Sequence, residues 1–108
     1  MVSAELALTI PSVLLVLAIC LTALALGIDQ VRVTDAARVG ARAASRGEDP
    51  VLVQRLVQER SPQGSQVHIG AEAEEVVVRV DAPARSRVLP LPRASAQASA
   101  VWEPGAGP

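Results

Sequence analysis

Residues 5–28 read ELALTIPSVLLVLAICLTALALGI, a single carboxylate followed by a run, residues 6–28, without any charged side chain. As a helix rising about 1.5 Å per residue, this run is roughly 34 Å long and can cross a hydrocarbon core of about 30 Å. Thirteen of its residues are Leu, Ile or Val, and their favourable insertion outweighs one carboxylate at the edge of the segment. The run therefore predicts a transmembrane helix. Glu5 is the only charged residue among the first 28, and an ionisable residue in such a place is a functional candidate.

Pro11 lies inside this run and lacks the amide that would bond to the Ala7 carbonyl. We therefore expect a kink or a local loosening of the helix. The hydroxyls of Thr9 and Ser12 are close enough to help satisfy the backbone there.

A cleaved secretory signal is the rival interpretation of the same run, since Ala23-Leu24-Ala25 resembles a cleavage site. The preceding residues contain no Lys or Arg and carry an acid, whereas a signal peptide needs a positive segment and a shorter apolar run. A retained anchor is favoured. An exported soluble domain, cut near Ala25, remains the alternative.

The charges that flank the run bear on its orientation. Arg32, Arg38, Arg42 and Arg46 all follow it within about 20 residues, so the positive-inside rule applied to this chain alone places the C-terminus in the cytoplasm. A short basic leader before Met1 would reverse that assignment.

Residues 29–47 predict an amphipathic continuation of the helix. Two faces recur at four-residue spacing: arginines at Arg38, Arg42 and Arg46, and small residues at Ala36, Gly40 and Ala44. Small residues at this spacing let another helix approach closely, although alanine is also abundant here and simply favours helices. The arginine stripe is typical of a solvated face. Gly47 is a favoured residue at a helix C-terminus, so we expect the helix to end there.

Residues 48–103 predict a small domain that contains both helix and sheet. Asp49 as N-cap and Pro50 at the first helical position begin a short helix that ends near Arg60. Alternating apolar residues predict a hairpin of two strands, 66–72 and 75–82, and a third strand at 93–102. In the hairpin we expect Val67, Ile69 and Ala71 to face Val76, Val78 and Val80.

The predicted fold class is thus α+β: a long N-terminal transmembrane-plus-amphipathic helix, a short second helix and a small antiparallel β-meander of about three strands. The chain divides into a membrane segment (1–28), its amphipathic continuation (29–47), the small domain (48–103) and a loose Gly- and Pro-rich tail (104–108).

No residue pattern indicates catalysis or a cofactor. His68 is the only histidine, and no second His or Cys lies near it to complete a metal site; Cys20 lies in the apolar run and behaves as a small hydrophobe. All ten basic residues are Arg, and the net charge is −1, which gives no strong field toward nucleic acid. We expect no enzyme activity, no cofactor, no metal, no small-molecule substrate and no nucleic-acid partner.

Three stretches carry a resemblance to a known family: MVSAELAL at residues 1–8, VRVTDAARVGARAA at residues 31–44 and ASAVWEP at residues 98–104. With the apolar helix and Pro11, they resemble the TadE-like minor pilins of the tight-adherence (Flp, type IVb) pilus system. The most specific part of the resemblance is the first 47 residues. Beyond them the match is one of pattern.

The resemblance implies cleavage by a prepilin peptidase just before Met1 and a role for Glu5 in assembly. The physical reason for a glutamate at this spacing is that a terminal ammonium buried in a helical bundle costs several kcal/mol unless it is paired. Glu5 of a neighbouring copy, offset by about one helical turn, would supply the opposite charge.

The resulting hypothesis is a single-pass membrane protein whose small domain faces outward, either in the cell membrane or in the pilus. Its partners would be other pilins, Tad-type assembly proteins and the prepilin peptidase. The alternative is a membrane adaptor that never enters a filament and uses the Ala36/Gly40/Ala44 face to bind a membrane protein of a secretion system.

Overall fold

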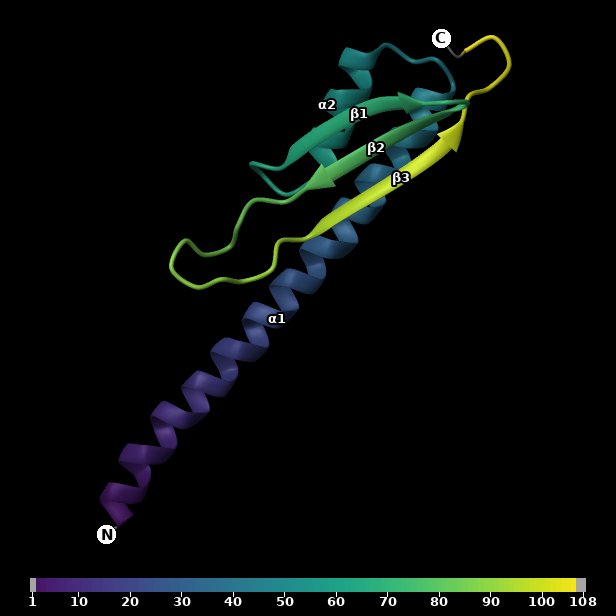
Figure 1. Ribbon diagram of the computed structural model, residues 1–108. Helices are drawn as coiled ribbons and strands as arrows, with labels where there is room; N and C mark the ends of the chain where they lie inside the picture. Colours follow the sequence, from purple (N-terminus) through teal and green to yellow (C-terminus); the bar gives the residue numbers. More distant parts are fainter. Residues whose placement is uncertain (1, 107–108) are drawn as a thin grey trace.

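The computed structural model describes residues 2–106 as a long helix that carries a small sheet at one end (Figure 1). The elements are α1 (Val2–Ser45), α2 (Pro50–Arg60), β1 (Gln66–Glu72), β2 (Glu75–Asp81) and β3 (Ser95–Val101). The molecule measures 76 × 20 × 19 Å along its principal axes. The predicted α+β class is confirmed, with a long apolar helix, a short second helix and three antiparallel strands.

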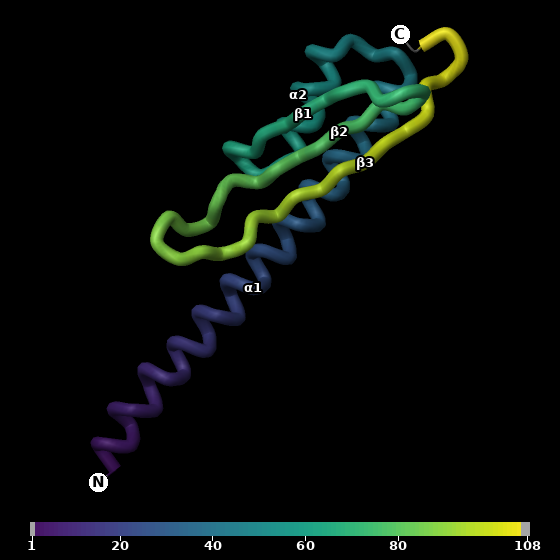
Figure 2. The backbone as a smooth tube through the Cα atoms, viewed as in Figure 1, coloured from purple at the N-terminus to yellow at the C-terminus, as the bar shows by residue number. Residues whose placement is uncertain are grey.

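The two halves of α1 have different surroundings. Residues 2–28, here named the apolar rod, project away from the rest of the chain (Figure 2). From Asp29 onward the helix lies across β2 and β3, and its buried residues enter the core. Residues 29–106 therefore form one globular domain, and the C-terminal half of α1 is part of that domain.

The sheet has the order β1-β2-β3, with both pairs antiparallel. The predicted hairpin is confirmed, with the two expected sets of residues facing each other; the structure pairs Val67 with Val80, Ile69 with Val78 and Ala71 with Val76. A two-residue turn, Ala73-Glu74, joins β1 to β2, and Ala73 takes a positive φ of 52° there. The third strand also forms, although it is shorter than predicted.

The core lies between α1, α2 and the inner face of the sheet. Its largest fully buried side chains are all valines: Val33 of α1, Val53 and Val57 of α2, and Val76, Val78 and Val80 of β2. Each such side chain contributes about 1.5–3 kcal/mol by leaving water. Alanines of α1 and β3 fill the remaining space, which lets the helix lie close to the strands.

Local signals fix the ends of the helices. The Asp49 carboxylate accepts a hydrogen bond from Val51 N at 3.0 Å, so the predicted N-cap of α2 is confirmed. At the other end, the Ser61 hydroxyl and amide both donate to the Val57 carbonyl. Gly47 has φ +83°, a conformation that glycine adopts at no steric cost, and it follows the end of α1 as expected.

Two expectations differ from the structure. A kink or a local loosening was expected at Pro11; α1 continues through Pro11 without a break, and Figure 2 shows no sharp bend in the N-terminal half of the helix. A loose tail was expected from residue 104, yet residues 104–106 form a turn. Ala106 N donates to the Glu103 carbonyl, and Ala106 packs against Gly47. Residues 107–108 lie outside the described part of the chain.

Candidate functional site

The apolar rod is exposed almost throughout. Every large aliphatic side chain in it except Leu26 is at least 50% exposed. Its most apolar window is long enough to cross a membrane, and none of that window is buried against the chain. A helix that this chain does not cover is not the core helix of its own domain. The rod therefore has the length and composition of a single membrane span.

Three hydroxyl groups of the rod bond to the backbone of their own helix. Thr9, Ser12 and Thr22 donate to the carbonyls four residues earlier, those of Glu5, Leu8 and Ala18, at 2.6–2.8 Å. None of these bonds reaches the Ala7 carbonyl, which Pro11 leaves without its amide partner. Internal hydrogen bonds of this kind remove the cost of placing a hydroxyl in hydrocarbon.

Glu5 lies in the first turn of α1, at the end of the rod farthest from the globular domain (Figure 1). Its side chain is exposed. Met1, the other residue expected to act in assembly, lies outside the described residues.

The small-residue face of α1 is buried inside the domain. Ala36, Gly40 and Ala44 are all buried, and α2 of the same chain packs against this half of α1. A Cβ added at Gly40 would collide with Val57 Cγ2 and lie 3.3 Å from Val78 Cγ1. Close approach of another helix was expected here, and the structure shows it within the chain. This face is not available to the partner of the adaptor hypothesis while the domain is folded.

Arg38 and Arg42 of the arginine stripe lie on the opposite, exposed side of α1, and Arg46 is exposed in the turn that follows the helix. Arg46 pairs with Glu48 at 3.3 Å, and both side chains are nearly half exposed. Such pairs contribute little to stability. The prediction of a solvated face is confirmed for Arg38, Arg42 and Arg46.

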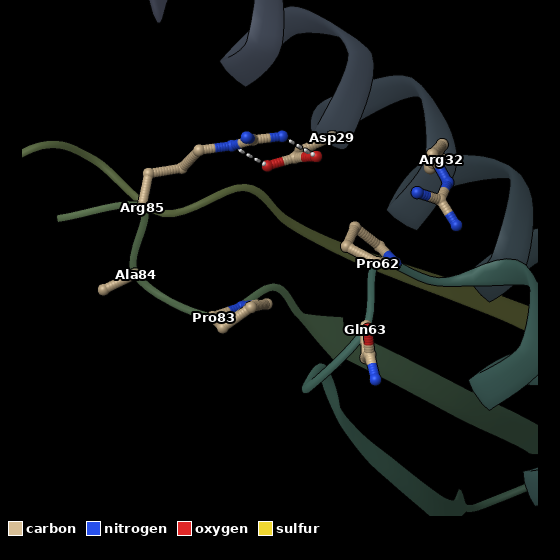
Figure 3. Close-up of a pocket in the computed structure, with 7 residues that line it drawn as sticks. All are labelled: Asp29, Arg32, Pro62, Gln63, Pro83, Ala84 and Arg85. Atoms are coloured by element: carbon tan, nitrogen blue, oxygen red, sulfur yellow. Dashed lines mark hydrogen bonds and ion pairs between the residues drawn. The ribbon is translucent and has the colours of Figure 1, made fainter.

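An ion pair that the sequence patterns did not predict marks the junction between rod and domain. Asp29, only 4% exposed, accepts two hydrogen bonds of 2.8 Å from Nε and an Nη of Arg85 (Figure 3). The hydrogen bond from Arg85 to Asp29, together with their attraction, raises the pKa of the guanidinium, against a smaller opposing effect of burial. A guanidinium is protonated at any pH at which proteins stay folded. The ion pair therefore attaches Arg85 to α1 at Asp29, directly after Ile28, the last residue of the apolar rod.

A second contact fixes the same region. The Gln30 side-chain amide donates to the Ser95 carbonyl at 2.8 Å, and its oxygen accepts from Ser95 N at 3.3 Å. The loop between β2 and β3 is thus attached to α1 near both of its ends. Asp29 stands directly after the apolar run, and that position is the only sequence signal for this site.

The surface of the domain carries several hollows. One, of about 320 Å³, lies between Asp29, Arg32, Pro62 and Arg85 (Figure 3). Another, of about 350 Å³, lies at the end of the domain farthest from the rod, here named the distal end, where Trp102 and Val53 line it. Within residues 2–106, no three His, Cys, Asp or Glu side chains lie together in a way that could hold a metal ion. His68 is exposed on β1, and Cys20 is exposed on the rod.

Comparison with known proteins identifies a relative of this chain. The chain is 38% identical over 101 residues to a Mycobacterium tuberculosis protein named "Apoptosis inhibitor Rv3655c", and the alignment covers 94% of this chain and 78% of that protein. The chain belongs to the Rv3655c family. No protein-family model matches the sequence, and no solved structure matches it.

The Rv3655c match is not confined to one part of the structure. Because it covers 94% of the chain, it extends over both the apolar rod and the globular domain. The alignment of the two chains therefore includes the rod, the junction at Asp29 and the sheet.

Proposed function

We propose that this protein is a membrane-anchored minor pilin or pseudopilin that assembles through α1 into a type IVb (Tad/Flp) pilus or its assembly machinery. The proposal places the rod in the membrane, the globular domain outside the cytoplasm, and Glu5 against the N-terminus of a neighbouring copy. Other pilins and Tad-type assembly proteins are its partners, and no catalysis is involved.

One observation carries the proposal: a single uninterrupted helix is exposed over most of residues 2–28 and packs into the core of the domain from Asp29 to Ser45. There is no linker between anchor and domain. A subunit of this form can leave the bilayer only if other apolar helices replace the lipid around the rod, which is what a helical filament core provides. The exposed aliphatic side chains on all sides of the rod suit such a bundle.

Glu5 gives the bundle a register. A carboxylate among apolar helices is costly unless a cation and hydrogen bonds satisfy it. The terminal ammonium of a neighbouring subunit, displaced by about one turn along the axis, would meet this need. At any other axial displacement between neighbouring subunits, Glu5 would be unpaired and the assembly less stable. The charge therefore selects one displacement among many that give similar apolar contacts.

The decisive experiment replaces Glu5 with Gln in cells that assemble the pilus, and measures the share of the protein that crosslinks into pilus complexes. Glu5→Gln should reduce that share at least tenfold while leaving the amount in the membrane unchanged. Glu59→Gln, an exposed carboxylate on α2, is the matched control and should incorporate normally. Unchanged incorporation of Glu5→Gln would remove the charge-pairing mechanism.

Two further measurements separate the alternatives. The mass of the intact membrane-extracted protein tests whether cleavage near Ala25 releases a soluble domain, since such a product would lack the rod. Labelling of Ser99→Cys, an exposed position on β3, by a membrane-impermeant maleimide in intact cells tests orientation. The Cys20→Ser background removes the native thiol.

The adaptor alternative now needs a different binding surface, because its partner face is occupied by α2 and β2. Its distinguishing outcome is location. An adaptor stays in the membrane fraction when surface filaments are sheared from the cells, whereas a pilin is found in the sheared fraction.

A further inference from the structure

The loop that joins β2 to β3, residues 82–94, carries the most exposed aliphatic side chain of the globular domain. Val88 is 90% exposed and Leu89 is 60% exposed. Loops of this length normally turn polar side chains to water. The sequence between Arg87 and Arg93 is instead VLPLP, without a single polar residue.

The loop holds these apolar side chains outward through its own hydrogen bonds. The Ser86 hydroxyl accepts from Val88 N at 3.2 Å and from Leu89 N at 3.1 Å. Leu91 N donates to the Leu89 carbonyl at 2.8 Å. The tip is therefore structured, and its exposure is built into the loop.

The position of the loop relative to the rod is fixed by the contacts at the junction. Arg85 binds Asp29, one residue beyond the apolar run, and Ser95 binds Gln30. Between these two attachments the loop extends past the end of the sheet toward the N-terminal half of α1 (Figures 1 and 2).

Partial burial along the rod supports this placement. The described residues of the rod that are half-buried are Thr22, Ala25 and Leu26. At spacings of three and four residues, they lie on the same face of α1 as Asp29. Arg85 thus attaches the loop on the face of α1 that carries these three half-buried residues.

The charge of the loop is of one sign. Residues 82–94 contain three arginines, Arg85, Arg87 and Arg93, and no acid. Asp29 neutralises Arg85, and the nearest acid on the sheet, Asp81, is paired with Arg79 at 3.2 Å. Arg87, next to the apolar tip, is exposed and forms no ion pair among the described residues.

We propose that the loop of residues 82–94 is a second membrane contact, in which Val88 and Leu89 enter the boundary between headgroups and acyl chains and Arg87 binds the phosphates of anionic lipids. This proposal rests on the membrane span of the proposed function, and not on assembly into a pilus. Apolar side chains beside arginines are the chemistry of interfacial anchors. A rod that fills the hydrocarbon up to Ile28 brings a loop attached at Asp29 into the headgroup layer.

The contact has a structural purpose. A single helix anchor leaves the domain free to tilt and to rotate about the helix axis. A second contact on one side of the helix fixes both the tilt and the face that the domain turns toward its neighbours in the plane of the membrane.

Quenching of tryptophan by brominated lipids tests the proposal on the full chain in vesicles of phosphatidylcholine and phosphatidylglycerol. The native Trp102 lies at the distal end of the domain. Its indole N–H makes no hydrogen bond within the described residues, so Trp102→Phe removes the native fluorophore without breaking a hydrogen bond. Three samples are compared: Leu89→Trp and Leu17→Trp, each in that background, and the native chain. We expect roughly twofold quenching of Leu89→Trp, because tryptophan at the interface lies near the brominated chains, strong quenching of Leu17→Trp and none of Trp102.

The outcomes separate this proposal from the function on which it rests. Quenching of Leu17→Trp without quenching of Leu89→Trp overturns the loop contact and leaves the span intact. Blue-shifted but unquenched emission from Leu89→Trp also overturns it, since the loop would then be buried against another copy or another protein. An unquenched Leu17→Trp overturns the span and the loop contact together.

The lipid charge is tested separately. Val88→Cys in the Cys20→Ser background, with Trp102 retained, carries a polarity-sensitive fluorophore at the tip. Its emission should shift to the blue when phosphatidylglycerol is added, and Arg87→Gln should abolish that shift. A shift that Arg87→Gln leaves unchanged contradicts the role of this arginine in binding anionic lipid.

Discussion

Gly40 of α1 lies directly against Val57 of α2, so closely that no Cβ fits between them. Val57 is fully buried and β-branched, which leaves its side chain little freedom to move aside. The close approach of the two helices therefore depends on a single missing methyl group.

Gly40→Ala should lower the free energy of unfolding of the domain by about 1–2 kcal/mol, because overpacking of the core exceeds the gain in helix propensity. Gly27→Ala is the matched control on the same helix, since nothing lies within 4 Å of a Cβ at that position. Urea unfolding of the detergent-solubilised protein measures both. A Gly40→Ala variant as stable as Gly27→Ala would contradict this close packing of α1 on α2.

Ala73→Gly should stabilise the domain by about 0.5–1 kcal/mol, because alanine at positive φ is strained and glycine is not. Ala73 occupies the turn between β1 and β2 with φ 52°. Ala71→Gly, in the extended backbone of β1, should have the opposite sign. Thermal unfolding of the two variants checks the pair, and a loss of stability in both would mean that the turn is not strained.

Asp49→Ala should cost about 1 kcal/mol of stability, since α2 would lose the acceptor for Val51 N. Asp49→Asn should stay close to the original protein because its amide oxygen can accept the same bond. Equal losses in the two variants, measured by urea unfolding, would indicate that the charge matters and the cap does not.

Arg85→Gln should release the loop of residues 82–94 from α1 and leave the buried Asp29 carboxylate without its partner. Cleavage by trypsin after Arg87 should become faster. The double variant Asp29→Asn/Arg85→Gln should have a higher free energy of unfolding than Arg85→Gln alone, because it leaves no buried charge unpaired.

Arg79→Gln is the control for that comparison. Arg79 pairs with Asp81 on the exposed side of β2, and its side chain is 54% exposed. Its replacement should change the rate of cleavage after Arg87 very little. Equal acceleration by Arg79→Gln and Arg85→Gln would contradict a specific attachment of the loop through Asp29.

Local chemistry explains why much of the fold could be predicted from sequence. The alternation of valines in β2, the cap at Asp49 and the glycine at position 47 each act within a few residues of their own position. The pairing of Val67 with Val80 follows from the alternation on both strands and the tight turn between them.

Contacts between distant residues could not be predicted in the same way. Asp29 and Arg85 are 56 residues apart, and Gln30 and Ser95 are 65 apart. Neither pair has a periodic pattern or a motif, since each is set by how the loop returns to the helix. The small residues of α1 did predict a close helix approach, but spacing alone does not distinguish a helix of the same chain from a helix of a partner.

Because α1 is one continuous helix, the number of residues between Glu5 and Asp29 fixes two quantities: the distance between them along the axis and the angle between them around it. Each residue added to an α-helix rotates the C-terminal part of the helix by about 100° and advances it by about 1.5 Å. One alanine inserted after Gly27 would rotate the whole sheet by about 100° around the helix axis relative to Glu5. The number of residues between Glu5 and Asp29 therefore sets the direction in which the domain faces around the helix axis.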